Sequence, residues 1–587
     1  MQYYFLAALV GLLSWCALIL TTPHLSCRCR PGEPCWPSSE EWNQLNISID
    51  GNLVRLRPVG HVCHYPNFDE AACSELLHLT RDSGWRASQP ETLQDWVWEG
   101  GASENQTCSV AGGPGETPCH QGRVPYYSAT VGSPEHVQKV VLFAKTHNLR
   151  LVIKNTGHDG CGRSAAQDSL QIHTHRLKGI QYHPDFVVQG ANTSSGPAVT
   201  VGAGVMQWEL YEKGSQDGYL IIGGECPTVG AVGGFLQGGG VSSFLSHARG
   251  LAVDNVLEFH IVLANGTLVT ANSYENQDLF WALRGGGGGT FGVVTQATLR
   301  VYPDDPVIVS TVSISSLRAD NGFWGKGVVS LFSMLQALNL DNIPGQFLLT
   351  VNPDFTFKAD LIIYLINNTN LPLVEEEVMK YLTMYKAREV SYRLTSKVLS
   401  KTSLSFRTTP DIYPESYGII QSSVLISNRL FNSIEGPMRI AEVFSKLPLG
   451  PNDLLFTSNL GGKVNAEDGS TSMHPAWRSS AQLVNYVKSV GPTVQEKFMG
   501  LEELSSVHMP VLYSLEPGFK VSYFNLGDPG EMDFQNVYWG DNYKRLALLK
   551  RDVDREELFV TKKGVGSDLW DDEGMCKKRT RRWISRG

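Results

Sequence analysis

The sequence predicts an α+β protein built from more than one domain, and three observations support this. The chain has 587 residues, whereas a single domain usually has roughly 100–200. Short β-rich runs alternate with amphipathic helical patterns along most of its length. Of its 58 glycines, 16 lie between residues 223 and 292 without a Gly-X-Y period, which excludes a collagen-like rod. Hydrophobic residues at 42% and aromatic residues at 10% exclude a disordered chain.

The N-terminus predicts a secretory route, and therefore a secretory-pathway or extracellular protein. Phe5–Leu20 is a largely apolar run that ends at Thr21-Thr22-Pro23, as in a signal peptide. We expect residues 1–26 to be removed, with a retained membrane anchor as the alternative. No later run is long and apolar enough to span a bilayer. Five Asn-x-Ser/Thr sequons support this route and predict N-glycans at some of Asn46, Asn105, Asn192, Asn265 and Asn367.

Residues 27–122 form a cysteine- and proline-rich N-terminal region. In an oxidising compartment this crowding predicts a region held by disulfides, and we favour Cys108–Cys119 as a local bridge. The histidines, His173 and His175 among them, lack a convincing zinc spacing, so we expect no metal site. The net charge of −9 argues against nucleic acid as a partner.

The following part predicts alternating strands and helices. Ser133 is a capping residue with Pro134 in the first turn, and Asn265-Gly266 is a strong hairpin signal. We expect, in order, a helix over 133–149, a strand over 149–157, a strand over 198–205, a helix over 206–216 and a hairpin over 256–270.

A second α+β lobe follows residue 306, where glycine becomes sparse. Residues 347–366 predict two antiparallel strands joined at Asn352-Pro353-Asp354. Residues 374–388 predict an amphipathic helix, and 536–559 is helix-like with leucines at its apolar positions.

The glycine motifs narrow the possible ligands. The literal GxGxxG string runs from Gly287 to Gly292, but strand-like residues follow it, which disfavours a Rossmann dinucleotide site. Two other turns, 154–164 and 223–243, could present successive backbone amides to an anion or a flat ring. His158 lies at the tip of the first turn, although a surface-loop histidine is the simpler interpretation. Cys226 opens the second turn as a nucleophile candidate, with a disulfide as the alternative.

Several strings together resemble the oxygen-dependent FAD-linked oxidoreductases of the vanillyl-alcohol-oxidase type, in particular the berberine-bridge-enzyme-like group and its secreted fungal members. They are VPYYSATVGSPEHVQKVV, VIKNTGHDGCGRSAAQDSLQIHTHRLKGI, GGECPTVGAVGGFLQGGG, GLAVDNVLEF, DLFWALRGGGGGTFGVVT and YWGDNYKRLALLKRDVDREELF. The resemblance covers residues 123–305 and 535–565, and it fades between them.

The resemblance implies a two-lobed PCMH-type FAD-binding domain and an α+β substrate domain, with a C-terminal segment that returns to the flavin. The implied boundaries are 27–122 for the N-terminal region, 123–304 for the FAD-binding domain, 305–530 for the substrate domain, 531–565 for the berberine-bridge-like segment and 566–587 for the tail.

The resemblance also implies roles for individual residues in binding FAD. His158 matches the histidine that bonds to the 8α methyl of the flavin, and Val229 matches the position that controls oxygen access. Cys226 matches the cysteine of a second flavin bond, but its step to Gly238 is one residue longer than expected, so a free thiol or a disulfide stays open. The remaining matches are Lys154, Asn155, Thr156 and Gly157 in the pyrophosphate loop, Gly230, Gly233 and Gly234 in the second turn, and Tyr538 and Asn542 near the flavin. Gly160-Cys161 departs from the Tyr-Leu usual in relatives.

The implied function is an oxidase that transfers a hydride from a small organic substrate to covalently bound FAD and then to O₂. Tyr513, Glu516 and Tyr523 are candidate bases, and purely structural roles stay open for each. We favour a step of secondary metabolism such as oxidative cyclisation in alkaloid assembly, the ergot type being one possibility. The alternatives are an alcohol or carbohydrate oxidase, a dehydrogenase without oxygen reactivity, and a catalytically silent secreted flavin-binding protein.

Overall fold

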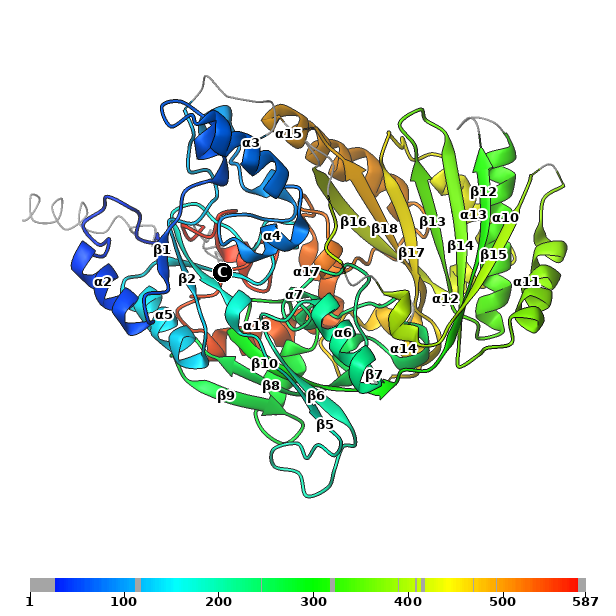
Figure 1. Cartoon of the computed structure of the whole chain (residues 1–587), viewed down its shortest axis with the longest axis horizontal. Coiled ribbons are helices and arrows are strands. Elements are labelled where there is room, and N and C mark those ends of the chain that lie inside the picture. The colour runs from blue at the N-terminus through cyan, green and yellow to red at the C-terminus, as the bar shows by residue number, and fades with distance from the viewer. Residues whose placement is uncertain are drawn as a thin grey trace, which may run out of the picture.

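The computed structural model describes residues 27–110, 118–243, 245–316, 322–388, 390–406, 409–412, 418–467, 469–491 and 493–578. The expected signal peptide, the centre of the loop between Cys108 and Cys119, and the end of the basic tail lie outside these ranges. Helices and strands are mixed throughout, so the α+β prediction is confirmed (Figure 1).

A four-stranded sheet with order β1-β2-β4-β3 forms the first half of one lobe. Helix α5 begins at Pro134, and the Ser133 side chain accepts a hydrogen bond from the His136 N–H, as the sequence predicts. The apolar stripe of α5 packs into the core of this half because Val137, Val140 and Val141 recur at helical spacing. The strands are β1 Leu53–Arg55, β2 Tyr127–Thr130, β3 Arg150–Lys154 and β4 Ser169–His173, and the helix is α5 Pro134–Thr146.

The second half of this lobe is a five-stranded antiparallel sheet with order β5-β6-β10-β8-β9. The hairpin between β8 and β9 turns at Asn265-Gly266, where Gly266 has a φ of +79°, as expected for that dipeptide. The glycine run that ends at Gly292 leads directly into strand β10, so it opens no Rossmann helix. The elements are β5 Ile180–His183, β6 Ala198–Gly202, α6 Gln207–Asp217, β7 Tyr219–Leu220, α7 Gly234–Gln237, α8 Ser246–Arg249, β8 Val256–Val262, β9 Leu268–Asn272, α9 Gln277–Leu283, β10 Val293–Arg300 and β11 Tyr302–Pro303.

The second lobe is a seven-stranded antiparallel sheet with order β15-β12-β14-β13-β17-β18-β16. Helix α10 contacts β12, β13 and β14, helix α11 contacts β12 and β15 at the edge of the molecule, and α13 packs beside α10 (Figure 1). The predicted hairpin over 347–366 is present as β13 and β14. The elements are β12 Val307–Ser316, α10 Gly322–Leu340, β13 Gly345–Val351, β14 Phe357–Ile366, α11 Leu371–Tyr385, β15 Arg393–Leu399, β16 Ile419–Ser427, α12 Asn428–Phe431, α13 Gly436–Phe444, β17 Leu454–Asn459, α14 Gly462–Ala466, β18 Ser480–Ser489, α15 Val494–Glu503 and α16 Met509–Tyr513.

Successive side chains of each strand in this sheet point to opposite faces, one toward the core and the other toward a cavity. Ile420 and Tyr486 point into the core beneath the helices. Their neighbours Ile419, Gln421 and Asn485 point the other way, into a cavity between the lobes. The sheet therefore has one apolar face for stability and one mixed face available for a ligand.

The N-terminal region contains three short helices and most of the disulfides. Its helices are α2 Ser39–Ser48, α3 Glu70–Leu79 and α4 Ser83–Ser88. The disulfides of the described chain are Cys27–Cys576, Cys29–Cys35, Cys63–Cys73 and Cys108–Cys119, so the predicted local bridge is confirmed. Cys161 and Cys226 are in no disulfide, which removes the disulfide alternative for Cys226.

The C-terminal segment corrects one expectation, because residues 536–559 do not form one helix. Helix α17, Phe534–Trp539, ends at Gly540, whose φ of +52° interrupts the helical path, and α18 spans Tyr543–Val553. The chain then returns beside β3, where Phe559 pairs with Leu151. Within the described ranges, no helix combines the length and apolarity that crossing a membrane requires.

Candidate functional site

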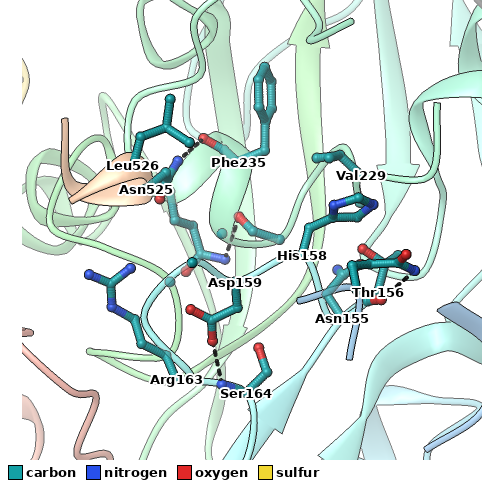
Figure 2. Close-up of a pocket in the computed structure, with 18 of the residues that line it drawn as sticks. Asn155, Thr156, His158, Asp159, Arg163, Ser164, Val229, Phe235, Asn525 and Leu526 are labelled. Atoms are coloured by element: carbon teal, nitrogen blue, oxygen red, sulfur yellow. Dashed lines mark hydrogen bonds between the residues drawn. The ribbon is translucent and has the colours of Figure 1, made fainter. Parts of the chain in front are cut away.

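A cavity of about 420 Å³ lies between the two lobes, within the size range of small-molecule sites. Its walls come from the loop after β3, the glycine turn at 223–241, the open face of the seven-stranded sheet and the segment 523–526. In Figure 2, His158, Asn155 and Val229 lie on one side, and Arg163 and Asn525 on the other. The site therefore joins segments that lie hundreds of residues apart.

The loop after β3 brings Asn155, Thr156, Gly157 and His158 to the cavity wall, but not Lys154. Lys154 is the last residue of β3, and its buried ammonium donates hydrogen bonds to the carbonyls of Arg86 and Gln89. Burial lowers the pKa of Lys154 to about 7. Its charge is turned into the protein, so it is not presented to a ligand.

His158 is held in one orientation beside a thiol. Its Nε2 lies 2.7 Å from Thr228 Oγ1 and 3.7 Å from Cys226 Sγ, and this sulfur lies 3.8 Å from a carboxylate oxygen of Asp411. Burial lowers the pKa of His158 to about 4, against the opposing effect of Asp95 and Asp411. The imidazole is therefore neutral near pH 7 and retains the lone pair that a nucleophile needs.

The second glycine turn makes a wall of bare backbone. Val229, Gly230, Gly233 and Gly234 all line the cavity. A Cβ on Gly233 would lie 2.6 Å from Asn155 Nδ2, and a Cβ on Gly230 would collide with the same side chain. These two glycines let the two turns pack together, whereas a Cβ on Gly234 would meet no protein atom within 4 Å.

Of the three candidate bases, the structure brings only Tyr523 to the cavity. Its hydroxyl accepts hydrogen bonds from the Gly240 N–H (3.0 Å) and from Asn525 Nδ2 (2.7 Å), and burial raises its pKa to about 12. Tyr513 and Glu516 do not line the cavity: Tyr513 donates to Glu531 at 3.1 Å, and Glu516 pairs with Arg429 at 2.7 Å.

Tyr538 and Asn542 also lie away from the cavity lining. The buried Tyr538 hydroxyl donates to the Asp528 carbonyl at 3.1 Å, and Asn542 Nδ2 donates to the Met473 carbonyl at 2.7 Å. Both residues therefore tie the C-terminal segment to its neighbours. Val560 and Thr561, further along this returning segment, do line the cavity.

Sequence reasoning missed the part of the site that comes from the N-terminal region. Gln94 and Asp95 line the cavity, and the Gln94 N–H donates to the Gly157 carbonyl at 3.0 Å. Burial raises the pKa of Asp95 to about 7. The region has weak periodicity, so no local signal pointed to these two residues. Other polar residues missed include Asp159, Arg163, Glu225, Asp411, Gln421, Ser458, Asn485 and Asn525.

Comparison with protein families identifies two matches. Residues 125–272 match the family described as "FAD binding domain", and residues 522–566 match the family described as "Berberine and berberine like". The first range contains both glycine turns, and the second contains Tyr523, α17, α18 and the return to the cavity.

Comparison with individual proteins gives matches over nearly the whole chain. "FAD-linked oxidoreductase easE" of Epichloe festucae var. lolii is 55% identical over 98% of this chain and 96% of its own length. "FAD-linked oxidoreductase penH" of Penicillium thymicola is 46% identical over 97% and 99%. Among solved structures, the VAO-type flavoprotein MtVAO615 of Myceliophthora thermophila superposes with a TM-score of 0.82 at 28% identity, over 94% of this chain and 100% of its own. Berberine bridge enzyme of Eschscholzia californica, at 17% identity and a TM-score of 0.66 over 89% and 98%, shares the fold.

The residues of the cavity fit an FAD cofactor. Asn155 lines the cavity, and its buried Oδ1 lies against Gly230 and accepts no hydrogen bond from any residue that the structure describes. The bare glycine wall admits a flat ring or a diphosphate, and neutral His158 is a nucleophile at that wall. The glycine turns and the histidine therefore both suit a flavin cofactor.

Proposed function

The chain belongs to the FAD-linked oxidoreductases with a berberine-bridge-like C-terminal segment, and on this premise we propose that it is an oxidase with covalently attached FAD. Its substrate is a small molecule of secondary metabolism, and the reaction class we favour is an alkaloid-type oxidative cyclisation with O₂ as the electron acceptor. The observation that carries this proposal is the placement of a neutral, half-buried His158 and the Cys226 thiol, 3.7 Å apart, at the glycine-lined cavity.

His158 is the residue we propose as the flavin tether. Because Thr228 Oγ1 occupies Nε2 at 2.7 Å, we assign the bond to Nδ1. We propose Cys226 for a second bond, because its sulfur is close to the imidazole and the Asp411 carboxylate lies 3.8 Å from it to take the thiol proton. A tethered cofactor cannot dissociate, which suits an enzyme that works outside the cell.

When bound, FAD supplies hydride acceptance and the passage of electrons to O₂. The chain supplies the groups around the substrate. Because the Tyr523 hydroxyl accepts two hydrogen bonds from the protein and keeps its proton at neutral pH, we propose that it donates to the substrate and orients it. Among the carboxylates that line the cavity, we propose Glu225 and Asp411 as the acceptors of a substrate proton. Val229 is small and leaves room for O₂ beside the cavity wall.

We also propose that the protein follows the secretory route. The four disulfides suit an oxidising compartment. Asn105, Asn192, Asn265 and Asn367 are exposed and therefore open to glycosylation. Asn46 is half-buried, and its side-chain carbonyl accepts a hydrogen bond from the Leu53 N–H, so it is the least accessible of the five.

Acid denaturation tests the tether. We expect yellow flavin to stay with the wild-type chain after precipitation, and the matched variants separate the two bonds. His158→Ala should release the flavin, or retain only the fraction held by Cys226, whereas Cys226→Ser should keep it. If all flavin washes off the wild-type chain, the assignment of His158 is wrong.

H₂O₂ release across a panel of alkaloid precursors, alcohols and oligosaccharides separates the proposed oxidase from a sugar or alcohol oxidase. A silent flavin-binding protein would give no turnover with any of them.

A further inference from the structure

Asn485, in strand β18, faces the cavity from the open side of the seven-stranded sheet. We propose that Asn485 is a specificity-determining residue, whose side-chain oxygen accepts a hydrogen bond from an N–H or O–H group of the substrate. This inference rests on the proposed function, because it takes the cavity to hold a small organic substrate beside the flavin. Asn485 lies outside both matched family ranges.

The side-chain oxygen of Asn485 is a buried acceptor without a donor. The residue is 1% exposed, and its Oδ1 accepts no hydrogen bond from any residue that the structure describes. An amide that loses its water on folding is destabilising unless another partner replaces that water. Such groups are uncommon in folded proteins, and each one calls for an explanation. Because Asn485 lines the cavity, a molecule bound in the cavity can supply the missing donor.

The polar neighbours of Asn485 on the same face of the sheet already have partners. Ser423 of β16 lies directly opposite Asn485, and its hydroxyl donates to the Leu526 carbonyl at 2.8 Å. Ser458 of β17 lies diagonally across, and its hydroxyl oxygen is 2.8 Å from that of Ser243. Neither serine donates to the amide oxygen, so the hydrogen-bonding capacity of Asn485 is left for a ligand.

The remaining neighbours of Asn485 on this face are apolar. Leu483 and Val487 flank it along β18, and Phe456 lies opposite it on β17. All three side chains line the cavity. A substrate that packs on these apolar groups covers Asn485 as well, and it satisfies the amide oxygen only if it places a donor there.

The charged groups of the cavity also favour a substrate that donates hydrogen bonds. Among the lining residues that the structure describes, four have carboxyl groups and one has a guanidinium. The guanidinium belongs to Arg163, whose Nε already donates to the Lys562 carbonyl at 3.0 Å. The wall is therefore rich in acceptors, and N–H and O–H groups complement it. The four carboxyl groups are those of Asp95, Asp159, Glu225 and Asp411.

Gln482 provides an internal comparison on the same strand. It is also buried, and neither atom of its side-chain amide has a hydrogen-bond partner among the described residues. Gln482 alternates with Val484 and Tyr486, which pack in the core on the other face of the sheet, and it does not line the cavity. A ligand in the cavity should therefore respond to Asn485 and not to Gln482.

The first measurement needs no ligand. Asn485→Leu replaces the unpaired amide with an apolar side chain of similar shape, in protein loaded with FAD. We expect its Tm to equal or exceed that of the wild type, because a buried oxygen without a partner is removed. A lower Tm, or a variant that does not fold, would show that Asn485 is bonded within the protein and would overturn the proposal.

The second measurement compares probes with and without a donor. Phenethylamine and its quaternary trimethyl derivative carry the same charge, and phenethyl alcohol and its methyl ether are both neutral. In calorimetric titrations of the FAD-loaded wild type, we expect the member with the donor to bind about tenfold more tightly in at least one pair. In Asn485→Leu this ratio should fall to about one. Gln482→Met is the matched control and should keep the wild-type ratio.

Three results of the titrations would overturn the proposal. The first is a wild-type protein that does not distinguish the members of either pair. The second is a preference that persists in Asn485→Leu, because it would then come from the size of the probe. The third is weaker retention of FAD by Asn485→Leu before any probe is added, which would assign the oxygen to the cofactor.

The proposed function is tested separately from this inference. If no compound of the panel gives H₂O₂, the oxidase is wrong. A donor preference that depends on Asn485 would still support its role as an acceptor for a molecule bound in the cavity.

Discussion

At the scale of single residues, neighbouring glycines of the cavity wall have different reasons to lack a side chain. Gly233 faces Asn155 of the other turn, and a Cβ there would lie 2.6 Å from the amide nitrogen. Gly234 faces open space inside the cavity, with no protein atom within 4 Å of a Cβ. We therefore expect the absence of a side chain at Gly233 to matter for stability and its absence at Gly234 to matter for ligand binding.

Alanine substitutions should give opposite outcomes at these two positions. In flavin-free protein, Gly233→Ala should lower the free energy of unfolding by about 1–3 kcal/mol, because the added methyl overpacks the contact with Asn155. Gly234→Ala should leave that stability unchanged but weaken FAD binding about tenfold or more, which is about 1.4 kcal/mol. Thermal unfolding and quenching of flavin fluorescence measure the two effects. Normal FAD affinity in Gly234→Ala would mean that the cofactor does not lie against this face.

The sequence predicted the residues of the site that are local to a motif. His158, Cys226, Val229 and the glycines reach the cavity because each belongs to a turn with its own recognisable pattern. Asp95 could not be found this way, since only a tertiary contact between distant segments, Gln94 N–H to the Gly157 carbonyl, brings it to the cavity. Lys154 shows the converse limit, because its place in the motif gave no information on the direction of its side chain.

At the scale of secondary-structure elements, a buried ion pair ties helix α18 to the lobe that contains the four-stranded and five-stranded sheets. Lys550 Nζ donates to the carbonyls of Thr290 (2.6 Å) and Phe559 (2.7 Å) and to the Asp554 carboxylate (2.5 Å). Asp554 in turn accepts the N–H groups of Leu558 and Phe559. The pair links the helix, the end of the glycine run and the returning chain through fully buried groups.

Replacing Lys550 should therefore be costly. Lys550→Met leaves the Asp554 carboxylate buried without its cation, and we expect a loss of about 3–5 kcal/mol in the free energy of unfolding. Lys544→Met, on the exposed side of the same helix, should change it by less than about 0.5 kcal/mol. Urea unfolding of the two variants measures the difference. Equal stabilities would show that water or a neighbouring group replaces the lost ammonium.

Elements were predictable where their periodicity was strong and uninterrupted. The helix capped by Ser133, the hairpin at Asn265-Gly266 and the strands over 347–366 all appear where the sequence placed them. The helix-like stretch over 536–559 is divided in the structure, because the left-handed φ of Gly540 ends α17 before α18 begins. The sheet partners were not predictable, since β6 pairs with β10 from nearly a hundred residues away and no local pattern encodes that choice.

At the scale of the whole molecule, the site exists only when both lobes and the N-terminal region are assembled. The cavity takes Asp95 from the N-terminal region, His158 from one lobe and Asn485 from the open face of the other. The fold class followed from the sequence, because many short patterns agree on an α+β architecture. The shape of the substrate space did not, because it depends on how the seven-stranded sheet faces the first lobe.

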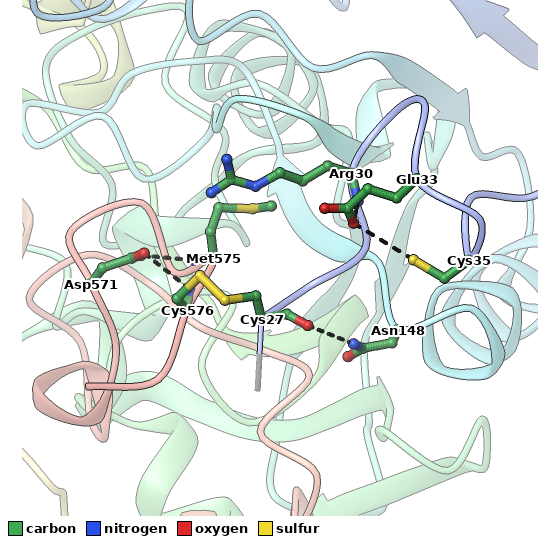
Figure 3. Close-up of a disulfide and its surroundings, with 8 residues drawn as sticks. All are labelled: Cys27, Arg30, Glu33, Cys35, Asn148, Asp571, Met575 and Cys576. Atoms are coloured by element: carbon green, nitrogen blue, oxygen red, sulfur yellow. Dashed lines mark hydrogen bonds between the residues drawn. A yellow bond between two sulfur atoms is a disulfide. The ribbon is translucent and has the colours of Figure 1, made fainter. Parts of the chain in front are cut away.

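The disulfide Cys27–Cys576 joins the two ends of the described chain, and its removal tests this assembly (Figure 3). Asn148 Nδ2 donates to the Cys27 carbonyl at 2.9 Å, and the Cys576 N–H donates to Asp571 at 3.0 Å, so both partners are seated on the lobe. Cys27→Ser/Cys576→Ser should cost about 2–4 kcal/mol and lower Tm. Cys29→Ser/Cys35→Ser opens a loop with a separation of only 6 residues and should lower Tm less. The opposite ranking would mean that local packing around each disulfide, rather than the length of the loop it closes, determines the loss of Tm.

The same disulfide imposes an order on biosynthesis. Its two cysteines are 549 residues apart, so at about 5–20 residues per second the ribosome needs on the order of half a minute to two minutes between them. Cys29 and Cys35 are already available to Cys27 during that time, whereas its native partner is translated 549 residues later. Cys27 must therefore stay unpaired, or exchange out of a wrong bond, until Cys576 has been translated.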